Sequence, residues 1–363
     1  MEICYSLIIP MAVAAIISSS LIPCWIKVCH KWGLFEKADD DRKRHKNVVP
    51  TMGGLAIFAG TLFSFLVFSD SSTVAESRYL LAACIALFFT GFFDDLLDLP
   101  ALRKLLLQIL CAIIVAYDGA RITNLYGVFG VTELPIIMQY LLTICVMVLV
   151  TNAYNLIDGI DGLAGSLGMV STIIFGFLFL EFGKPEFAVL SFALAGALLG
   201  FLFYNFHPAK IFMGDSGSLL IGFILSTQAI QLLNCNASML HNGINFSPAL
   251  IAAVLFIPIY DVIRVSVIRI LTGNSPLRAD RNHIHHMINQ NGFGQRVTTV
   301  LIVVMNLMFV GLALMLPKIT LSLFIVLCLC LGMITINSYV ISGLANIYGR
   351  LGGKVYRRVV QAN

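Results

Sequence analysis

Acidic side chains cluster directly after an apolar run near residue 93. Asp94, Asp95 and Asp98 lie within five positions of each other. Asp94 and Asp98, four residues apart, would share one face of a helix. Carboxylates this close repel one another unless a cation lies between them, and Mg²⁺ is a hard cation that suits oxygen ligands. The alternative is a solvated helix end with Arg103 and Lys104 as counter-charges.

A second segment combines amide, acid and glycine residues. Asn152, Asn155, Asp158 and Asp161 are spaced by three, and a glycine follows each aspartate. The four side chains would share a face if the segment were helical. The glycines instead permit a tight turn and a close approach of the backbone to a ligand. An ordinary Asp-Gly turn is the alternative interpretation.

A third segment leads from Asn205 into an apolar run that begins at Leu219. Asp215, Ser216 and Ser218 would then lie at the N-terminus of a helix. Unpaired backbone N–H groups and the positive end of the helix dipole favour a phosphate or an acidic cap there. Asp215 could equally reach a metal ion.

Histidines and arginines mark a fourth segment. Arg281 precedes His283, His285 and His286. Imidazole and guanidinium groups can donate hydrogen bonds to a diphosphate, and arginine does so with a bidentate fork. Zinc is the alternative, but no cysteine lies nearby and the other candidate ligands are hard oxygen donors.

A basic run, Arg42 to Lys46, lies ahead of a further apolar stretch. Basic residues beside a membrane span are usually an orientation signal. Lys46, at the end of the run, and Thr51 are the residues here that we expect to contact a substrate.

The elements that position these segments are membrane helices. Of the 363 residues 59% are hydrophobic and only 12% are charged, and the mean hydropathy is +0.92. A bilayer core needs roughly 20 apolar residues per helix. We predict an all-α polytopic membrane protein with about eleven spans. The spans begin near residues 5, 53, 78, 105, 135, 166, 186, 215, 248, 297 and 319.

We expect one membrane domain over residues 1–363, because the polar intervals are too short for a separate soluble domain. The intervals that carry the polar segments are 30–52, 94–104, 152–165, 205–218 and 271–296.

Charge predicts the orientation of these spans. With eleven spans, only four of the 23 Lys and Arg residues fall on one side, namely Arg78, Arg121, Lys184 and Lys318. The positive-inside rule then places the N-terminus in the periplasm and the C-terminus in the cytoplasm. All the polar segments gather on the cytoplasmic face. The net charge of +4 suits anionic membrane lipids and does not indicate nucleic acid binding.

Four motifs in order carry a resemblance to a known family. They are Asp-Asp-x-x-Asp at 94–98, Asn-x-x-Asp-Gly-x-Asp-Gly at 155–162, Phe-Met-Gly-Asp-x-Gly-Ser at 212–218 and His-Ile-His-His at 283–286. The chain resembles the polyprenyl-phosphate N-acetylhexosamine-1-phosphate transferases (glycosyltransferase family 4) from about residue 31 to residue 296.

Within that family the chain is most similar to the branch that transfers N-acetylglucosamine-1-phosphate. Ile284 interrupts a histidine run that is typically unbroken in phospho-MurNAc-pentapeptide transferases, and an eleventh predicted span follows Lys318. The branch that starts wall teichoic acid uses similar motifs and stays open.

The resemblance implies a Mg²⁺-dependent reaction, with Mn²⁺ as a substitute, in the bacterial inner membrane. UDP-N-acetylglucosamine and undecaprenyl phosphate would give undecaprenyl-diphosphate-N-acetylglucosamine and UMP. The product would start O-antigen of lipopolysaccharide or a related surface glycan. The chain could act as a monomer or as a homodimer.

The resemblance also implies roles for individual residues. Metal coordination falls to Asp215, which we expect Asp158 to assist, and acid or base work to Asp94 and Asp95. We count Asp158 and Asp161 with the catalytic residues. The residues expected to contact substrates are Lys46, Thr51, Asn155, Asn205, Phe212, which would stack on uracil, Arg281, His283, His285 and His286.

An ion-coupled secondary transporter is the alternative of another class. Intramembrane carboxylates and glycine-broken helices also mark carriers. Carriers hold those groups near the middle of the membrane, whereas here they are predicted to gather at one interface. The one-sided distribution favours the transferase.

Overall fold

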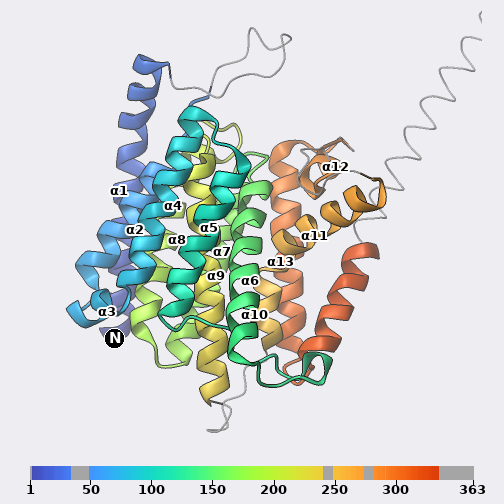
Figure 1. The fold of residues 1–363 in the computed structure, drawn as a ribbon. Coiled ribbons are helices and arrows are strands. Elements are labelled where there is room, and N and C mark those ends of the chain that lie inside the picture. Colours follow the sequence, from blue (N-terminus) through green and yellow to red (C-terminus); the bar gives the residue numbers. More distant parts are fainter. Residues whose placement is uncertain (1, 34–48, 240–247, 274–281, 291, 335–363) are drawn as a thin grey trace, which may run out of the picture.

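In the computed structural model the chain forms a bundle of helices (Figure 1). The structure describes residues 2–33, 49–239, 248–273, 282–290 and 292–334. No strand occurs in these ranges, and an isolated antiparallel bridge joins Asn124 to Glu133. The predicted all-α class is therefore confirmed for the described part of the chain.

The helices follow the apolar runs of the sequence. Pro185 is the first residue of its helix, where its missing N–H group would have no partner in any case. In chain order the elements are α1 (Glu2–Trp32), α2 (Gly54–Phe68), α3 (Ser71–Glu76), α4 (Arg78–Leu97), α5 (Ala101–Tyr117), the 3₁₀ helix η2 (Val128–Gly130), α6 (Ile136–Ile157), α7 (Leu163–Glu181), α8 (Pro185–Asn205), α9 (Gly214–Met239), α10 (Pro248–Val254), α11 (Phe256–Leu271), α12 (Ile284–Gln290) and α13 (Gln295–Met315).

Seven described helices are long and apolar enough to cross a membrane, or eight if α10 and α11, which meet at 68°, form one bent span. A helix lies at each of the eleven predicted starts. However, α2, α5 and a helix over Leu321–Ile334 have fewer than 18 residues. The chain thus has the helices of a polytopic membrane protein, while eleven spans and their orientation stay predictions.

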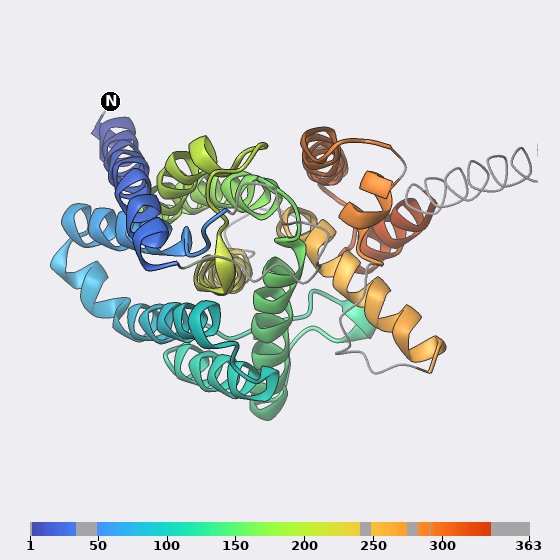
Figure 2. The same cartoon turned by 90° about the horizontal axis from the view of Figure 1, so that it is seen from above.

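Helix α9 lies at the centre of the bundle (Figure 2). It packs against α2, α4, α6, α7 and α10. Most of its side chains between Gly214 and Asn236 are buried inside the protein. Any residue at the N-terminus of α9 is therefore surrounded by several other helix ends.

Helix α1 packs closely against α8 through two glycines one helical turn apart. A Cβ atom added at Gly196 would lie 2.0 Å from the backbone oxygen of Met11, and one at Gly200 would lie 2.5 Å from that of Ala15. Small residues permit this close approach of helix backbones in membranes. The contact holds the N-terminal helix on the outside of the bundle.

We expect Gly196→Ala to destabilise the protein by about 1 to 3 kcal/mol, because the added methyl group overpacks the contact between α1 and α8. Thermal unfolding in detergent measures the effect. Gly311→Ala in α13 is the control, since a Cβ atom there meets no atom within 4 Å. Alanine favours helices, so the control should unfold at the same temperature or higher. Equal midpoints for the two variants would contradict the close packing.

Candidate active site

The segments with polar motifs meet at one end of the bundle (Figure 1). They are the last turns of α4, α6 and α8, the first turn of α9, and their adjoining loops. The N-terminus of the chain lies at the opposite end. A cavity of about 790 Å³ opens among these segments. Its lining includes the predicted residues Thr51, Asp94, Asn155, Asp158, Phe212 and Asp215, and Asp95, Asp161 and Asn205 also reach its wall.

A lysine bridges two of the carboxylates in this cavity. The Lys104 Nζ atom donates a 2.8 Å hydrogen bond to Asp94 Oδ2 and a 2.9 Å bond to Asp215 Oδ2. The other oxygen of Asp94 accepts from the Leu99 backbone N–H at 2.8 Å. The sequence suggested Lys104 only as a counter-charge of a helix end. In the structure it joins α4, α5 and α9, which no local pattern could have indicated.

Asn155 holds the second oxygen of Asp215. Its Nδ2 atom donates to Asp215 Oδ1 at 2.8 Å and to Ser218 Oγ at 3.0 Å. Asp158 follows at the end of α6 and lines the same cavity. Both oxygens of the Asp215 carboxylate are therefore oriented, one by α5 and one by α6.

Asp95 caps the N-terminus of α9. Its Oδ1 atom accepts from the Asp215 backbone N–H at 2.7 Å, while Oδ2 accepts from the Ser216 backbone N–H at 3.2 Å and from Ser216 Oγ at 2.8 Å. A carboxylate is favourable beside the unpaired N–H groups of a helix start. The acidic cap expected at this helix is thus supplied by α4, and Asp95 positions Asp215.

Two predicted residues connect the loops that follow α6 and α8. Helix α6 ends at Ile157, so Asp161 does not continue a helical face with Asn155. Asp161 Oδ2 lies 2.6 Å from His207 Nδ1 and accepts from the Ala209 backbone N–H at 3.1 Å.

The buried amide of Asn205 serves the same two loops. It accepts a hydrogen bond from the Gly162 backbone N–H at 2.9 Å and donates to the Ile211 backbone oxygen at 2.8 Å. The positive φ of Gly162, 76°, provides the turn before α7. The contacts of Asp161 and Asn205 thus hold the loops of the cavity wall together.

Asp94 and Asp98 do not share one helical face as the sequence predicted. Helix α4 ends at Leu97, and Asp98 adopts a left-handed backbone conformation with a φ of 53°. Asp98 therefore leaves the helix direction, although it still lines the cavity.

The histidine motif lies behind the cavity wall. His283 Nδ1 is 2.8 Å from Asp261 Oδ2, and the side chain of His285 is only 1% exposed. Neither ring nitrogen of His285 has a hydrogen-bond partner among the described residues. A Cβ atom at Gly159 would lie 2.3 Å from His285 Nε2. The imidazole can therefore pack against the loop only because residue 159 is a glycine.

The histidines His283, His285 and His286 are not part of the described cavity lining. The sequence predicted that the backbone at the glycines of this loop approaches a ligand closely. In the structure the side chain of His285 makes the close approach to Gly159. Lys46 and Arg281 lie outside the described residues.

Burial and the neighbouring charges of His286 and His283 lower the pKa of His285 to about 3. The unfolded chain, with an imidazole pKa of about 6.5, therefore binds more protons than the folded chain between about pH 6.5 and pH 3. The stability that neutral His285 contributes is present above pH 6.5 and is lost as the pH falls through this window. The loss from pH 7.5 to pH 5 is about 2 kcal/mol.

We therefore expect the unfolding midpoint of His285→Gln to fall less between pH 7.5 and pH 5 than that of the parent. Thermal unfolding in detergent at the two pH values measures the difference. His30→Gln removes an exposed imidazole and should retain the parent's dependence on pH. A parent-like dependence in His285→Gln would show that His285 titrates normally.

The cavity contains several side-chain oxygen atoms that a metal ion could use as ligands. No group of three His, Cys, Asp or Glu residues that could hold a metal ion occurs among the described residues. Two carboxylates, Asp94 and Asp215, nevertheless converge on one ammonium, and Asp158 lines the same cavity. Mg²⁺ is usually held by one or two carboxylates together with substrate phosphates and water. The donor set of the cavity therefore fits a Mg²⁺ ion.

Fold and site together define a helical membrane protein in which three of the four motifs, those at 94–98, 155–162 and 212–218, line one cavity at one end of the bundle. Residues 77–233 match the model of glycosyl transferase family 4. The chain belongs to this family, because relatives that match most of its length are 34% identical to it. The predicted resemblance of the chain to this family is thereby confirmed.

Three of these relatives carry names that describe a reaction. A "Probable undecaprenyl-phosphate N-acetylglucosaminyl 1-phosphate transferase" of Bacillus subtilis (strain 168) is 34% identical over 89% of this chain and 88% of its own length. Undecaprenyl-phosphate alpha-N-acetylglucosaminyl 1-phosphate transferases of Yersinia pestis and Escherichia coli (strain K12) are each 34% identical over 76% of this chain. The matches cover 75% and 74% of those proteins.

Proposed function

We propose that this chain transfers N-acetylglucosamine-1-phosphate from UDP-N-acetylglucosamine to undecaprenyl phosphate, giving undecaprenyl-diphosphate-N-acetylglucosamine and UMP. The names of the relatives suggest the reaction. The observation in this chain that supports it most is that Asp94, Asn155 and Asp215 line one cavity of about 790 Å³ while Lys104 joins the two carboxylates. Family membership favours this activity over an ion-coupled transporter.

The reaction joins two anionic groups. An oxygen of the lipid phosphate forms a bond to the β-phosphorus of the nucleotide-sugar, and the bond from that phosphorus to the bridging oxygen breaks. UMP leaves with the bridging oxygen. Electrostatic repulsion opposes the approach, and phosphoryl transfer is catalysed mainly by positioning and charge neutralisation. A site for this chemistry needs cations beside precisely held oxygen groups.

Lys104 supplies a fixed positive charge beside two carboxylates of the cavity. It lies 2.8 to 2.9 Å from the carboxylates of Asp94 and Asp215. Asp215 and Asp158 would hold Mg²⁺, or Mn²⁺ in its place, with Asn155 orienting Asp215. The bound metal ion would neutralise developing charge on the diphosphate oxygens.

Asp94 is the candidate that would orient the lipid phosphate or accept its proton. A phosphate monoester has a second pKa near 6, so little base strength is needed at neutral pH. Asp95 would act through Asp215, because both of its oxygens accept hydrogen bonds from the start of α9. Trapping of a labelled phosphoenzyme on Asp94 would replace direct displacement by a covalent route.

The proposed location is the bacterial inner membrane, with the cavity facing the cytoplasm. The end of the bundle with the cavity also carries Lys31, Arg103, Lys210 and Arg296, as the positive-inside rule requires of a cytoplasmic face. The product would start O-antigen or a related surface glycan.

Release of UMP from UDP-N-acetylglucosamine by the purified full chain tests this proposal. We expect release that requires both undecaprenyl phosphate and Mg²⁺. A donor series with UDP-N-acetylgalactosamine and UDP-MurNAc-pentapeptide identifies the sugar, and we expect UDP-N-acetylglucosamine to be fastest. Absence of UMP release with every donor, in protein that remains folded, would overturn the proposal.

A further inference from the structure

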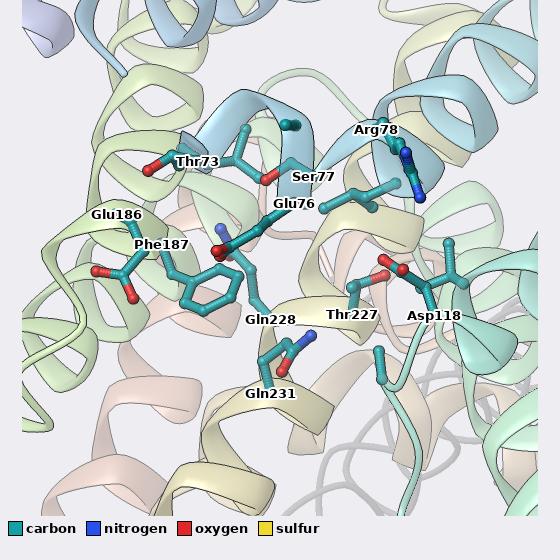
Figure 3. Close-up of a pocket in the computed structure, with 15 residues that line it drawn as sticks. Thr73, Glu76, Ser77, Arg78, Asp118, Glu186, Phe187, Thr227, Gln228 and Gln231 are labelled. Carbon is teal, nitrogen blue, oxygen red and sulfur yellow. The ribbon is translucent and has the colours of Figure 1, made fainter. Parts of the chain in front are cut away.

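A second cavity, of about 490 Å³ (Figure 3), is lined by α3, which lies at the opposite end of the bundle in Figure 1. Its walls come from α3 and the first turns of α4 and α8, from the end of α5, and from α9 at Thr227, Gln228 and Gln231. Gln228 is thirteen residues along α9 from Asp215, which corresponds to roughly 20 Å of helix. The second cavity is therefore separate from the candidate active site.

Carboxylates outnumber cations in the lining of this second cavity. Glu76, Asp118 and Glu186 line it together with a single guanidinium, that of Arg78. Lys184 lies outside the lining, with its Nζ atom 3.6 Å from Glu186 Oε1. Among the described residues, the carboxylate of Glu76 has no ion-pair partner. The cavity thus has a surplus of negative charge.

A buried hydrogen-bond acceptor in the wall has no donor. Gln228 is 2% exposed, and its Nε2 atom donates to Ser191 Oγ at 2.9 Å. Its Oε1 atom has no hydrogen-bond partner in the described part of the chain. An unsatisfied buried polar atom costs about 1 to 3 kcal/mol. The amide lies among the labelled side chains in Figure 3, so a ligand in the cavity could provide the missing donor.

We propose that this cavity binds a ligand with a primary or secondary ammonium group, carried by an aminophospholipid headgroup or by a free polyamine. An ammonium group has N–H donors, a positive charge and no acceptor, and therefore complements both the carboxylates and the carbonyl oxygen of Gln228. The ring of Phe187 in the same wall adds an aromatic surface, which attracts cations. The volume is within the usual range of about 300 to 1,000 Å³ for small-molecule sites.

Binding to the purified full chain in detergent tests the site with two probes. Spermidine is the free amine, and phosphatidylethanolamine is the lipid amine. Phosphatidylcholine and phosphatidylglycerol serve as comparison lipids, because their headgroups have no N–H donor. We expect native mass spectrometry and thermal shift to detect spermidine, phosphatidylethanolamine or both, and neither comparison lipid at the same site. The probe that binds identifies the source of the ammonium group.

Three variants locate the binding. Glu76→Gln, on the short helix α3, and Gln228→Met, which removes the unsatisfied oxygen at similar volume, should each weaken the binding about tenfold. Glu133→Gln removes an exposed carboxylate at the same end of the bundle, outside the cavity, and should bind as the parent does. Binding of neither amine, equal binding of phosphatidylcholine, or parent-like affinity in both Glu76→Gln and Gln228→Met would overturn the proposal.

Discussion

Asp215→Asn is expected to lower the rate of UMP release about 1,000-fold. The substitution keeps the size of the side chain but removes the charge that Lys104 and Asn155 orient in the cavity. Loss of one well-placed electrostatic group in a water-poor site typically costs 100- to 1,000-fold in rate. Because Asp215 is also proposed to hold the metal ion, its effect should be at the upper end of this range. The residual rate of Asp215→Asn should also depend less steeply on Mg²⁺ concentration.

Asp70→Asn is the matched control for Asp215→Asn. Asp70 precedes α3, is exposed and makes no capping hydrogen bond with its side chain. It loses the same charge far from the cavity and should retain the parent's rate. Thermal unfolding of both variants confirms that they are folded. Near-parental turnover by Asp215→Asn would remove this residue from the metal site and from the mechanism.

Lys104→Gln is expected to reduce UMP release about 100-fold. Without the ammonium group, the carboxylates of Asp94 and Asp215 face each other with no cation between them and repel. The negative charge of the incoming phosphates then adds to this repulsion. Because a divalent cation relieves the same repulsion, raising the Mg²⁺ concentration should recover part of the lost rate.

The neighbouring Arg103 provides a control for Lys104→Gln. Its side chain is exposed at the start of α5, and Arg103→Gln removes one positive charge at nearly the same depth. Arg103→Gln should stay within about twofold of the parent's rate. If both variants lose the same activity, the effect comes from the general positive charge of this face. A parent-like rate in Lys104→Gln would contradict this role and would show that Lys104 is only a counter-charge at a solvated helix end.

Local sequence was sufficient for the helices and for the end of the bundle at which the motifs gather. Apolar runs of about 20 residues predict helices wherever they occur, and a helix lies at every predicted start. Polar residues at the boundaries of those runs must then lie at helix ends. Asp94, Asn155 and Asp215 were therefore expected near one another before any packing was known.

The partner of each of those residues depends on how the helices pack. Asp95 and Asp215 are 120 residues apart, and their contact requires α4 to approach α9 closely. Gly91 permits that approach, because a Cβ atom there would lie 2.4 Å from the backbone oxygen of Asp215. Nothing in the local sequence distinguishes a carboxylate that caps a helix from one that contacts a substrate. The sequence consequently grouped Asp94 and Asp95 together, whereas the structure separates their contacts.

The lengths of the shorter helices mark another limit of local patterns. Apolar runs begin where α2 and α5 begin, but both helices are shorter than a typical membrane span. Hydropathy locates such segments without showing whether they cross the bilayer, since neighbouring helices can bury them instead.

The amino-acid sequence by itself determined the helical class, the family and many of the polar residues that line the candidate active-site cavity, because hydropathy and motif spacing are local properties. Only the tertiary structure decided that Lys104 joins two carboxylates, that His285 is buried behind Gly159, and that Gln228 lies beside Glu76 in a second cavity. These contacts join residues far apart in the chain. They follow from the way the helices pack. How closely two helices approach depends on the surfaces of both helices, and the sequence of one helix alone does not determine it.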